Sequence, residues 1–239
     1  MGIEDFWGAS LDQVLGNSPD LSETARRRVG RWMYLSRDKA SVPFSEARYV
    51  VIDTETSGLD VKRDHLLSIG ACVVSGASID LGQTFYRELR QARASARDNI
   101  LVHGIGRGAQ LAGEMEADAL SAFLAFAGKC TLAAFNAPFD QEVLAVAMRR
   151  YLGVRFKPSW IDLAELPKAM YPADALELRT LDHWLERFSI VHLERHNALA
   201  DAYCTAQLLL VMLCKAKHEG YSTTRDLKRA ERNYHWQRR

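Results

Sequence analysis

The stretch Tyr49-Val-Val-Ile-Asp-Thr-Glu-Thr-Ser-Gly-Leu-Asp60 joins an apolar run to two carboxylates, and the rest of the chain is best interpreted from it. Its first four residues are apolar and two are valines, which predicts a buried strand, and the Ser-Gly pair that follows predicts the end of that strand. Side chains two apart on a strand point to the same face, so we expect Asp53 and Glu55 to point the same way from its end. Two carboxylates held this close repel each other and favour a bound cation.

The neighbours of this pair favour contact with a phosphate oxygen. Asp-x-Glu alone is a weak motif, because solvated acids at a strand tip are common. Here the pair is surrounded by small or polar residues that leave the backbone accessible, namely Thr54, Thr56, Ser57 and Gly58. The pair becomes a candidate site if further carboxylates follow downstream at the ends of predicted elements.

The composition is that of a soluble globular protein. Of the 239 residues, 48% are hydrophobic and 26% are charged, and a chain of this size can bury its own core in one domain. The net charge is only +1. No global field therefore points to a polyanionic partner, and any basic surface must be local.

Cysteine usage and the first residues indicate a reducing compartment. The four cysteines, Cys72, Cys130, Cys204 and Cys214, lie far apart in apolar runs and show no Cys-x-x-Cys spacing. This predicts buried free thiols rather than a zinc site or a disulfide framework. The chain begins without a signal-peptide pattern, and we expect no apolar stretch long enough to span a bilayer. We therefore expect a cytoplasmic protein with no membrane partner.

The chain divides into three predicted parts. Residues 1–46 form an N-terminal helical extension, in which Asp20-Leu-Ser-Glu23 is similar to a capping box and is followed by apolar residues at helical spacing and by several arginines. Residues 47–216 form the central domain, and residues 217–239 form a basic tail that includes Tyr234 and Trp236. The arginines and the tail either lie in solvent or contact nucleic acid or a partner protein.

Strands and helices alternate through the central domain. An apolar run, a Ser75–Ser78 turn and a second run predict an antiparallel hairpin after the first strand. Residues 88–112 predict a loop with a short helix. Further strands are expected at 131–135 and 160–162, and helices at 116–128, 136–151, 163–170, 178–187 and 197–215.

Four carboxylates fall at the edges of these elements. Asp53 and Glu55 end a strand, Asp140 lies in the first turn of a helix, and Asp201 lies early in the last long helix. Taken alone, the position of Asp140 has an equally good structural explanation, because helix N-termini attract anions. Together, the four acids can hold two hard cations such as Mg²⁺ or Mn²⁺, and two such ions about 3.5–4 Å apart can hold the attacking and leaving oxygens of a phosphodiester. His196, five residues before Asp201, can take a proton from the attacking water.

Three ordered motifs carry a resemblance to a known family. Asp53-Thr-Glu55, Asn136-Ala-Pro-Phe-Asp140 and His196-Asn-Ala-Leu-Ala-Asp201 resemble the exonuclease motifs of the DEDDh family, which includes the DNA polymerase III epsilon subunit, ribonuclease T and oligoribonuclease. His103-Gly-Ile105 also falls where the family often has His-Gly-Ile. The likeness covers about residues 48–215.

The resemblance implies both a fold and a reaction. The fold is a ribonuclease H-like α/β fold, in which a mixed central sheet with three antiparallel strands and further parallel strands is flanked by helices. The reaction is two-metal, 3′-to-5′ release of nucleoside monophosphates from single-stranded DNA or RNA ends. Carried over residue by residue, the resemblance implies that the four carboxylates are metal ligands and that His196 is the general base. It also implies that four further residues contact the substrate: Thr56, Leu59, His103 and Asn136.

The sequence departs from the family pattern at two points, of which the first concerns packing and the second concerns the predicted partners. Phe135 stands where the family often has His before the second motif, and about 46 residues precede the first motif. A proofreading subunit that docks a DNA polymerase or repair complex through this extension is therefore one alternative, and a scaffold with little activity of its own is another. The preference for DNA or RNA, the physiological metal and the oligomeric state stay open.

Overall fold

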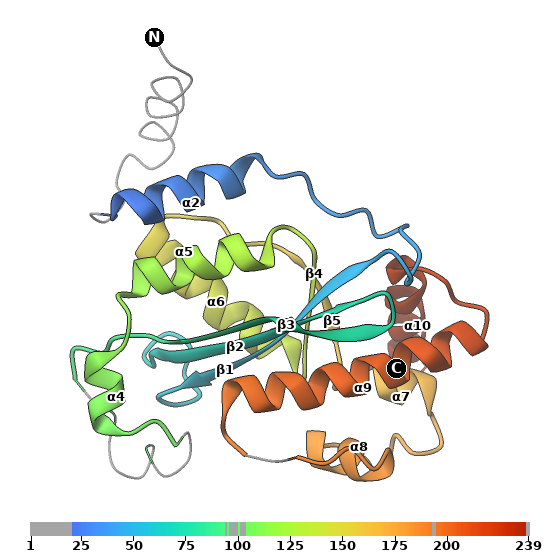
Figure 1. The fold of residues 1–239 in the computed structure, drawn as a ribbon. Coiled ribbons are helices and arrows are strands. Elements are labelled where there is room, and N and C mark those ends of the chain that lie inside the picture. The colour runs from blue at the N-terminus through green and yellow to red at the C-terminus, as the bar shows by residue number, and fades with distance from the viewer. Residues whose placement is uncertain (1–20, 94, 96–99, 101–103, 193–194, 238–239) are drawn as a thin grey trace.

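The computed structural model describes residues 21–93, 95, 100, 104–192 and 195–237. In this part of the chain, five strands form one sheet in the order β3-β2-β1-β4-β5. β1 pairs antiparallel with β2 and β2 with β3, whereas β1 pairs parallel with β4 and β4 with β5. The predicted mixed sheet is confirmed (Figure 1). The strands are β1 (Arg48–Thr56), β2 (Leu66–Ser75), β3 (Ser78–Glu88), β4 (Thr131–Ala134) and β5 (Ser159–Asp162).

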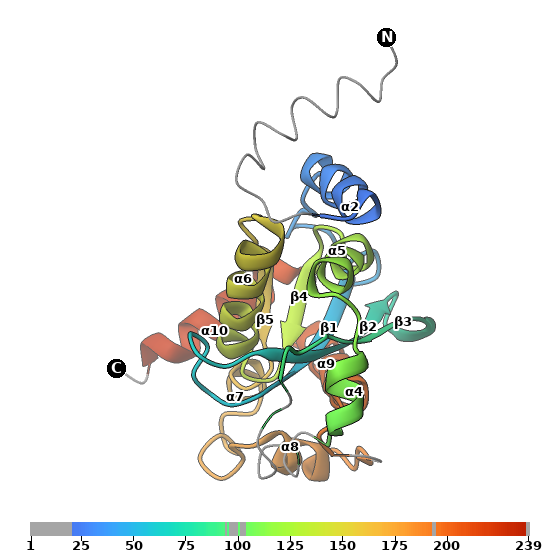
Figure 2. The same ribbon diagram turned by 90° about the vertical axis from the view of Figure 1, so that its left-hand side faces the viewer.

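Helices cover both faces of this sheet. One face is covered by α2, α5 and α6, and the other mainly by α9 with α7, α8 and α10 (Figures 1 and 2). α4 lies between the hairpin and α5 in the chain. The bounds are α2 (Glu23–Tyr34), α4 (Arg107–Ala112), α5 (Glu116–Ala127), α6 (Ala137–Leu152), α7 (Leu166–Met170), α8 (Leu181–Arg187), α9 (Ala198–His218) and α10 (Thr224–Gln237).

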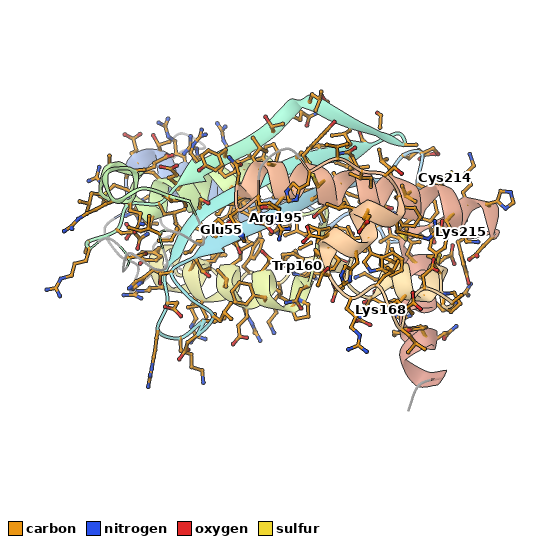
Figure 3. All side chains as sticks on the ribbon, turned by 90° about the horizontal axis from the view of Figure 1, so that it is seen from below. Glu55, Trp160, Lys168, Arg195, Cys214 and Lys215 are labelled. Carbon is orange, nitrogen blue, oxygen red and sulfur yellow. The ribbon has the colours of Figure 1, made fainter. Side chains whose placement is uncertain are left out.

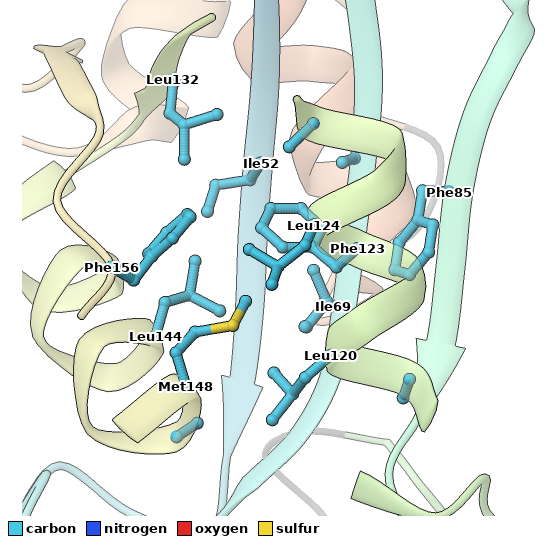
Figure 4. Packing of buried hydrophobic residues seen from close by; sticks show 14 of the residues in the cluster. Ile52, Ile69, Phe85, Leu120, Phe123, Leu124, Leu132, Leu144, Met148 and Phe156 are labelled. Atoms are coloured by element: carbon cyan, nitrogen blue, oxygen red, sulfur yellow. The ribbon is translucent and has the colours of Figure 1, made fainter. Parts of the chain in front are cut away.

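The side chains of β1 divide between two hydrophobic cores. Val50 and Ile52 are buried with residues of α5 and α6, as Figure 4 shows for Ile52. Tyr49 and Val51 are buried on the opposite face with residues of α9. Because side chains on a strand alternate between its faces, this pattern directs Asp53 and Glu55 to the α9 side and Thr54 to the α6 side.

The two segments outside the predicted central domain both pack on it. Ser22 is the N-cap of α2, and its Oγ accepts a hydrogen bond from the backbone N–H of Ala25 at 3.1 Å; Asp20 lies outside the described residues. Ala25 and Val29 of α2 are buried in the core shared with α5 and α6. In the tail, α10 buries Leu227 and Ala230 in the α9 core. The boundaries at residues 46 and 216 stay predictions.

α9 is the helix that carries the last predicted carboxylate. By length and composition it could cross a membrane, which the sequence analysis did not expect, but half of its apolar window is buried inside the domain. Its buried residues face β1 and β2, so its hydropathy is that of a core helix. Cys214 on α9 is exposed, contrary to the prediction, whereas Cys72, Cys130 and Cys204 are buried free thiols.

Candidate functional site

Three of the predicted carboxylates meet at the end of β1. Asp53, Glu55 and Asp201 each offer an oxygen, and these oxygens lie within 4.8 Å of one another. Two of the acids come from β1 and the third comes from the first turn of α9. Figure 3 shows Glu55 near the end of α9 where Arg195 lies, whereas Cys214 and Lys215 mark the far end of the helix.

A glycine lets α9 approach the sheet at this point. Gly70 pairs with Asp53 across the β1–β2 ladder. A Cβ at Gly70 would lie 2.1 Å from the carbonyl carbon of Ala198 and 2.2 Å from the backbone nitrogen of Leu199. The start of α9 therefore contacts the backbone of β2 directly beside Asp53. This contact places Asp201 one turn further along, next to the β1 acids.

The N-terminus of α9 is fixed by its own cap. The Oδ1 of Asn197 accepts hydrogen bonds from the backbone N–H groups of Leu199 and Ala200, at 3.1 and 3.2 Å. Such a cap satisfies donors that otherwise lack a partner in the first turn. The helix therefore begins at a defined residue, and Asp201 has a defined position relative to Gly70.

Asp140 approaches the same strand end from the other face of the sheet. It is buried in the first turn of α6, and its Oδ1 accepts a hydrogen bond from the hydroxyl of Thr54 at 2.7 Å. Asp140 is not one of the three acids whose oxygens cluster within 4.8 Å. It is close enough to Asp53 for their charges to repel. The structure thus brings all four predicted acids to one end of β1.

Asp162 is a further acid in this region that the sequence analysis assigned no role. It lies at the end of β5, and its Oδ1 accepts hydrogen bonds from the backbone N–H groups of Asn136, Ala137 and Ala164, at 3.1, 3.3 and 2.9 Å. Asp162 therefore holds the N-terminus of α6, on which Asp140 lies. Its position at a strand end, like that of Asp53, was the signal that could have identified it.

The charges at the end of β1 are poorly compensated by the protein itself. The pKa of Asp53 is raised well above its usual value, first by burial and then by repulsion from Asp140, Asp201 and Glu55. Burial and repulsion by Asp201 and Asp140 raise the pKa of Glu55 to about 7. Burial raises the pKa of Asp140 to about 7 although the Thr54 hydrogen bond opposes the shift. A cation bound among these acids would relieve both the desolvation and the repulsion.

Two histidines flank Asp201. His196, predicted from its spacing, is exposed and has a positive φ of 60°. His192, which the sequence analysis did not single out, is the one in contact: its Nε2 lies 2.8 Å from Oδ1 of Asp201. The His192 side chain is only 10% exposed, and its ring nitrogens make no hydrogen bond of good geometry with described residues. Both histidines lower the pKa of Asp201, against the larger effect of burial.

His192 belongs to a chain of ionisable side chains that connects α8 to the segment before α9. Its Nδ1 lies 3.9 Å from Oδ1 of Asp182 on α8, and the same Asp182 forms an ion pair with Arg195. No spacing rule in the sequence identifies His192, because the contact depends on how the segment before α9 folds back over Asp201.

Three of the four predicted substrate residues belong to the described part of the chain, and they lie on elements that carry the carboxylates or follow them. Thr56 lines a small pocket of about 30 Å³ with residues of α6 and of the loop after β1. Leu59 is 87% exposed in that loop, and Asn136 is exposed and has a positive φ of 63° at the start of α6. His103 lies outside the described residues. The substrate roles of these four residues stay predictions.

Comparisons with known proteins agree with this geometry. Residues 50–209 match the family model described as RNase T exonuclease. This chain belongs to that exonuclease family. The resemblance predicted from the three motifs is therefore confirmed at the level of the family. The matched residues contain most of β1, all of α6 and the first half of α9, which are the elements that bring the four acids together.

Two relatives and one solved structure show how far the likeness extends. The chain is 30% identical over 169 residues to the PolC-type DNA polymerase III of Thermotoga maritima. This match covers 70% of this chain and 12% of that protein. It is 31% identical over 188 residues to a DNA polymerase III subunit epsilon-like protein of Rhodobacter capsulatus. This match covers 77% of this chain and 26% of that protein. The chain thus spans at most about a quarter of either relative.

The solved structure shares the fold. Escherichia coli exonuclease I, in complex with a dT13 oligonucleotide, superposes with a TM-score of 0.62 and 19% identity over 72% of this chain and 42% of that one. The predicted ribonuclease H-like exonuclease fold is confirmed.

Proposed function

We propose that the protein is a metal-dependent 3′-to-5′ exonuclease that removes nucleoside monophosphates from single-stranded nucleic-acid ends. The observation that supports this most strongly is the meeting of Asp53, Glu55 and Asp201 within 4.8 Å. Partly buried acids whose charges repel one another destabilise a fold, and a bound cation would remove this cost. Membership of an exonuclease family makes a phosphodiester the natural substrate of such a site.

The donor set fits a hard divalent cation. The clustered ligand atoms are all carboxylate oxygens, which favour Mg²⁺ or Mn²⁺ over Zn²⁺. Asp53, Glu55 and Asp201 would hold such ions, with Asp140 on the α6 side. When bound, two ions would stabilise the charge that develops on the attacking and leaving oxygens of a phosphodiester. The protein contributes the positions of the acids, which the β1 register, Gly70 and the Asn197 cap fix in advance.

Proton removal from the attacking water is assigned to His196. Histidine is a common general base in hydrolysis, and His196 is exposed on the segment that precedes α9, where a substrate and water can reach it. In the structure His192 occupies the position next to Asp201. We therefore give His192 the separate role of orienting the Asp201 carboxylate from the side of α8.

Single-stranded DNA is the substrate that we propose first. The structure of E. coli exonuclease I with dT13 supports this choice, because the same fold in that protein binds a single strand. RNA remains the alternative, since discrimination depends on a contact to the 2′-hydroxyl. The relatives named as DNA polymerase III proteins support a proposal that the chain acts beside a polymerase.

The test is cleavage of 5′-labelled single-stranded DNA and RNA with Mg²⁺ or Mn²⁺. We expect a ladder that shortens from the 3′ end, and we expect EDTA or Asp201→Asn to abolish it. Glu142→Gln is the matched control, because Glu142 is an exposed acid on α6, two residues after Asp140. If folded, metal-loaded protein cleaves neither substrate, the proposal fails and the scaffold alternative replaces it.

A further inference from the structure

A pocket of about 380 Å³ lies at the opposite end of the sheet from the carboxylates. It is lined by the end of α2 and the loop after it, by the turn before β4, and by residues 153–159 before β5. β1, β4 and β5 run parallel. The starts of β4 and β5 are therefore at the end remote from Asp53. A volume of this size is in the range of ligand pockets in general, which is about 300–1,000 Å³.

The rim of this pocket carries an excess of positive charge. Arg37, Lys129, Arg155 and Lys157 line it, against one acid, Asp38. Arg37, Arg155 and Lys157 are exposed and form no ion pair within the described part of the chain. Burial lowers the pKa of Lys129, and repulsion by Arg37 lowers it further. The cations at this rim are thus not neutralised by neighbouring acids.

The helix C-termini at this pocket explain the presence of only some of these cations. α2, α5 and α6 all end at the pocket, and the carbonyls at a helix C-terminus attract cations. The last carbonyls of α5 already accept hydrogen bonds from Arg48, at 3.0 Å to Phe126 and 3.3 Å to Ala127. Lys129 donates to the carbonyl of Met33 at the end of α2, at 2.9 Å. Arg37, Arg155 and Lys157 are therefore available to a ligand.

The floor of the pocket is apolar. Trp32, Met33, Val154 and Phe156 contribute to its lining, and Phe156 is also part of the core beside Leu132 and Leu144 (Figure 4). An apolar floor within a basic rim is complementary to a large apolar side chain flanked by negative charges.

The aromatic rings argue against a nucleic-acid base as the occupant. Lys129 lies over the ring of Trp32, 4.7 Å from its centroid, and the Trp32 and Phe156 centroids are 6.0 Å apart. The indole N–H of Trp32 donates to the carbonyl of Gly128 at 2.7 Å. Both rings are thus engaged within the protein, whereas binding of single strands relies on free ring faces on which bases stack.

We propose that this pocket binds an acidic peptide segment of a partner protein. One large apolar side chain of the segment packs on the floor, and carboxylates on either side of it contact Arg37, Arg155 and Lys157. The site would connect the protein to its partner from the end of the sheet remote from the carboxylates. A bound partner would therefore leave the entrance for substrate free.

The test uses a fluorescein-labelled peptide, Ser-Asp-Glu-Phe-Glu-Asp-Ser, and the full chain, with binding measured by fluorescence anisotropy. We expect saturable binding that weakens with added salt. The double variant Arg155→Glu/Lys157→Glu should weaken it about tenfold or more, as reversal of two ion pairs implies. Replacing the Phe of the peptide by Ser should also weaken it. The matched control is Lys217→Glu/Arg225→Glu, which reverses two exposed cations that do not line the pocket.

A second measurement does not depend on any charge variant. The indole N–H resonance of Trp32, assigned by Trp32→Phe, should shift when the peptide is added to the wild-type protein. Absence of saturable binding up to millimolar peptide, or an unmoved Trp32 resonance, would overturn the proposal. It also fails if the charge reversal leaves peptide binding unchanged and weakens binding of an oligothymidine instead, because the rim would then serve nucleic acid.

Discussion

The end of β1 and the segment between α8 and α9 both act on the carboxylate cluster, but they are built differently. Asp53 and Glu55 are fixed by backbone pairing with β2 and by two hydrophobic cores beneath them. The segment before α9 is positioned by side chains instead, through the contacts of Asp182 with Arg195 and His192. The acids are therefore held in place by the backbone of the sheet, whereas we expect that each histidine can be replaced without loss of the fold.

The largest effect should come from His196, if it removes the proton from water. His196→Ala should lower the cleavage rate by about 10²–10⁴-fold, as expected for a general base. Because His196 is exposed, the free energy of unfolding and Mn²⁺ binding should stay as in the wild type. Single-turnover cleavage and Mn²⁺ titration measure the two properties separately. If His196→Ala lost Mn²⁺ binding together with cleavage, His196 would help to bind the metal, and the role of general base alone would be contradicted.

His192 should show the opposite pattern. His192→Ala removes the contact at 2.8 Å to Asp201, and loss of a group that orients a metal ligand typically costs 10–100-fold in metal affinity. Mn²⁺ titration checks this value, and His218→Ala, at the exposed end of α9, is the control. Unchanged or tighter binding of Mn²⁺ would contradict the orienting role.

Gly70 tests whether the β1 end depends on close packing of α9. Gly70→Ala places a Cβ 2.1 Å from the backbone of Ala198, so the start of α9 must move. Such overpacking costs about 1–3 kcal/mol of the free energy of unfolding, and the displaced Asp201 should weaken Mn²⁺ binding. Urea unfolding measures the first effect. Gly108→Ala is the control, because a Cβ there meets nothing within 4 Å; equal effects of both variants would refute the packing argument.

A further effect concerns the pH dependence of stability in the absence of metal. The pKa of Asp140 is raised to about 7 in the folded protein, compared with about 4 in an unfolded chain. The folded state therefore binds more protons between these values, and its free energy of unfolding falls as pH rises from about 4 to 7, by at most about 1.4 kcal/mol per pH unit. In EDTA, Asp140→Asn should stabilise the protein at pH 8 and have little effect at pH 4. An equal effect at both pH values would contradict the raised pKa.

Much of the carboxylate site could be predicted because its information is local. The apolar run before Asp53 specifies a buried strand, and alternation along that strand places Asp53 and Glu55 on one face. The predicted starts of two helices likewise located Asp140 and Asp201. The mixed sheet followed from the hairpin and from the family resemblance.

The remainder depended on contacts between distant residues. The contact of Gly70 with α9 and the bond from Thr54 to Asp140 join elements more than 80 positions apart, with no shared local pattern. His192 reaches Asp201 only because of the path that the segment after α8 follows. The basic pocket combines three separate loops, so the sequence analysis, which considered charge runs, did not identify it.

Calorimetric titration of Mn²⁺ at pH 8 into the wild type, Asp53→Asn and Asp201→Asn would show whether acids from β1 and from α9 form one metal site. If so, each variant should lose affinity by at least tenfold while remaining folded, and the double variant should lose little more than either single one, because the two residues share a site. Wild-type affinity in either folded single variant would contradict the account.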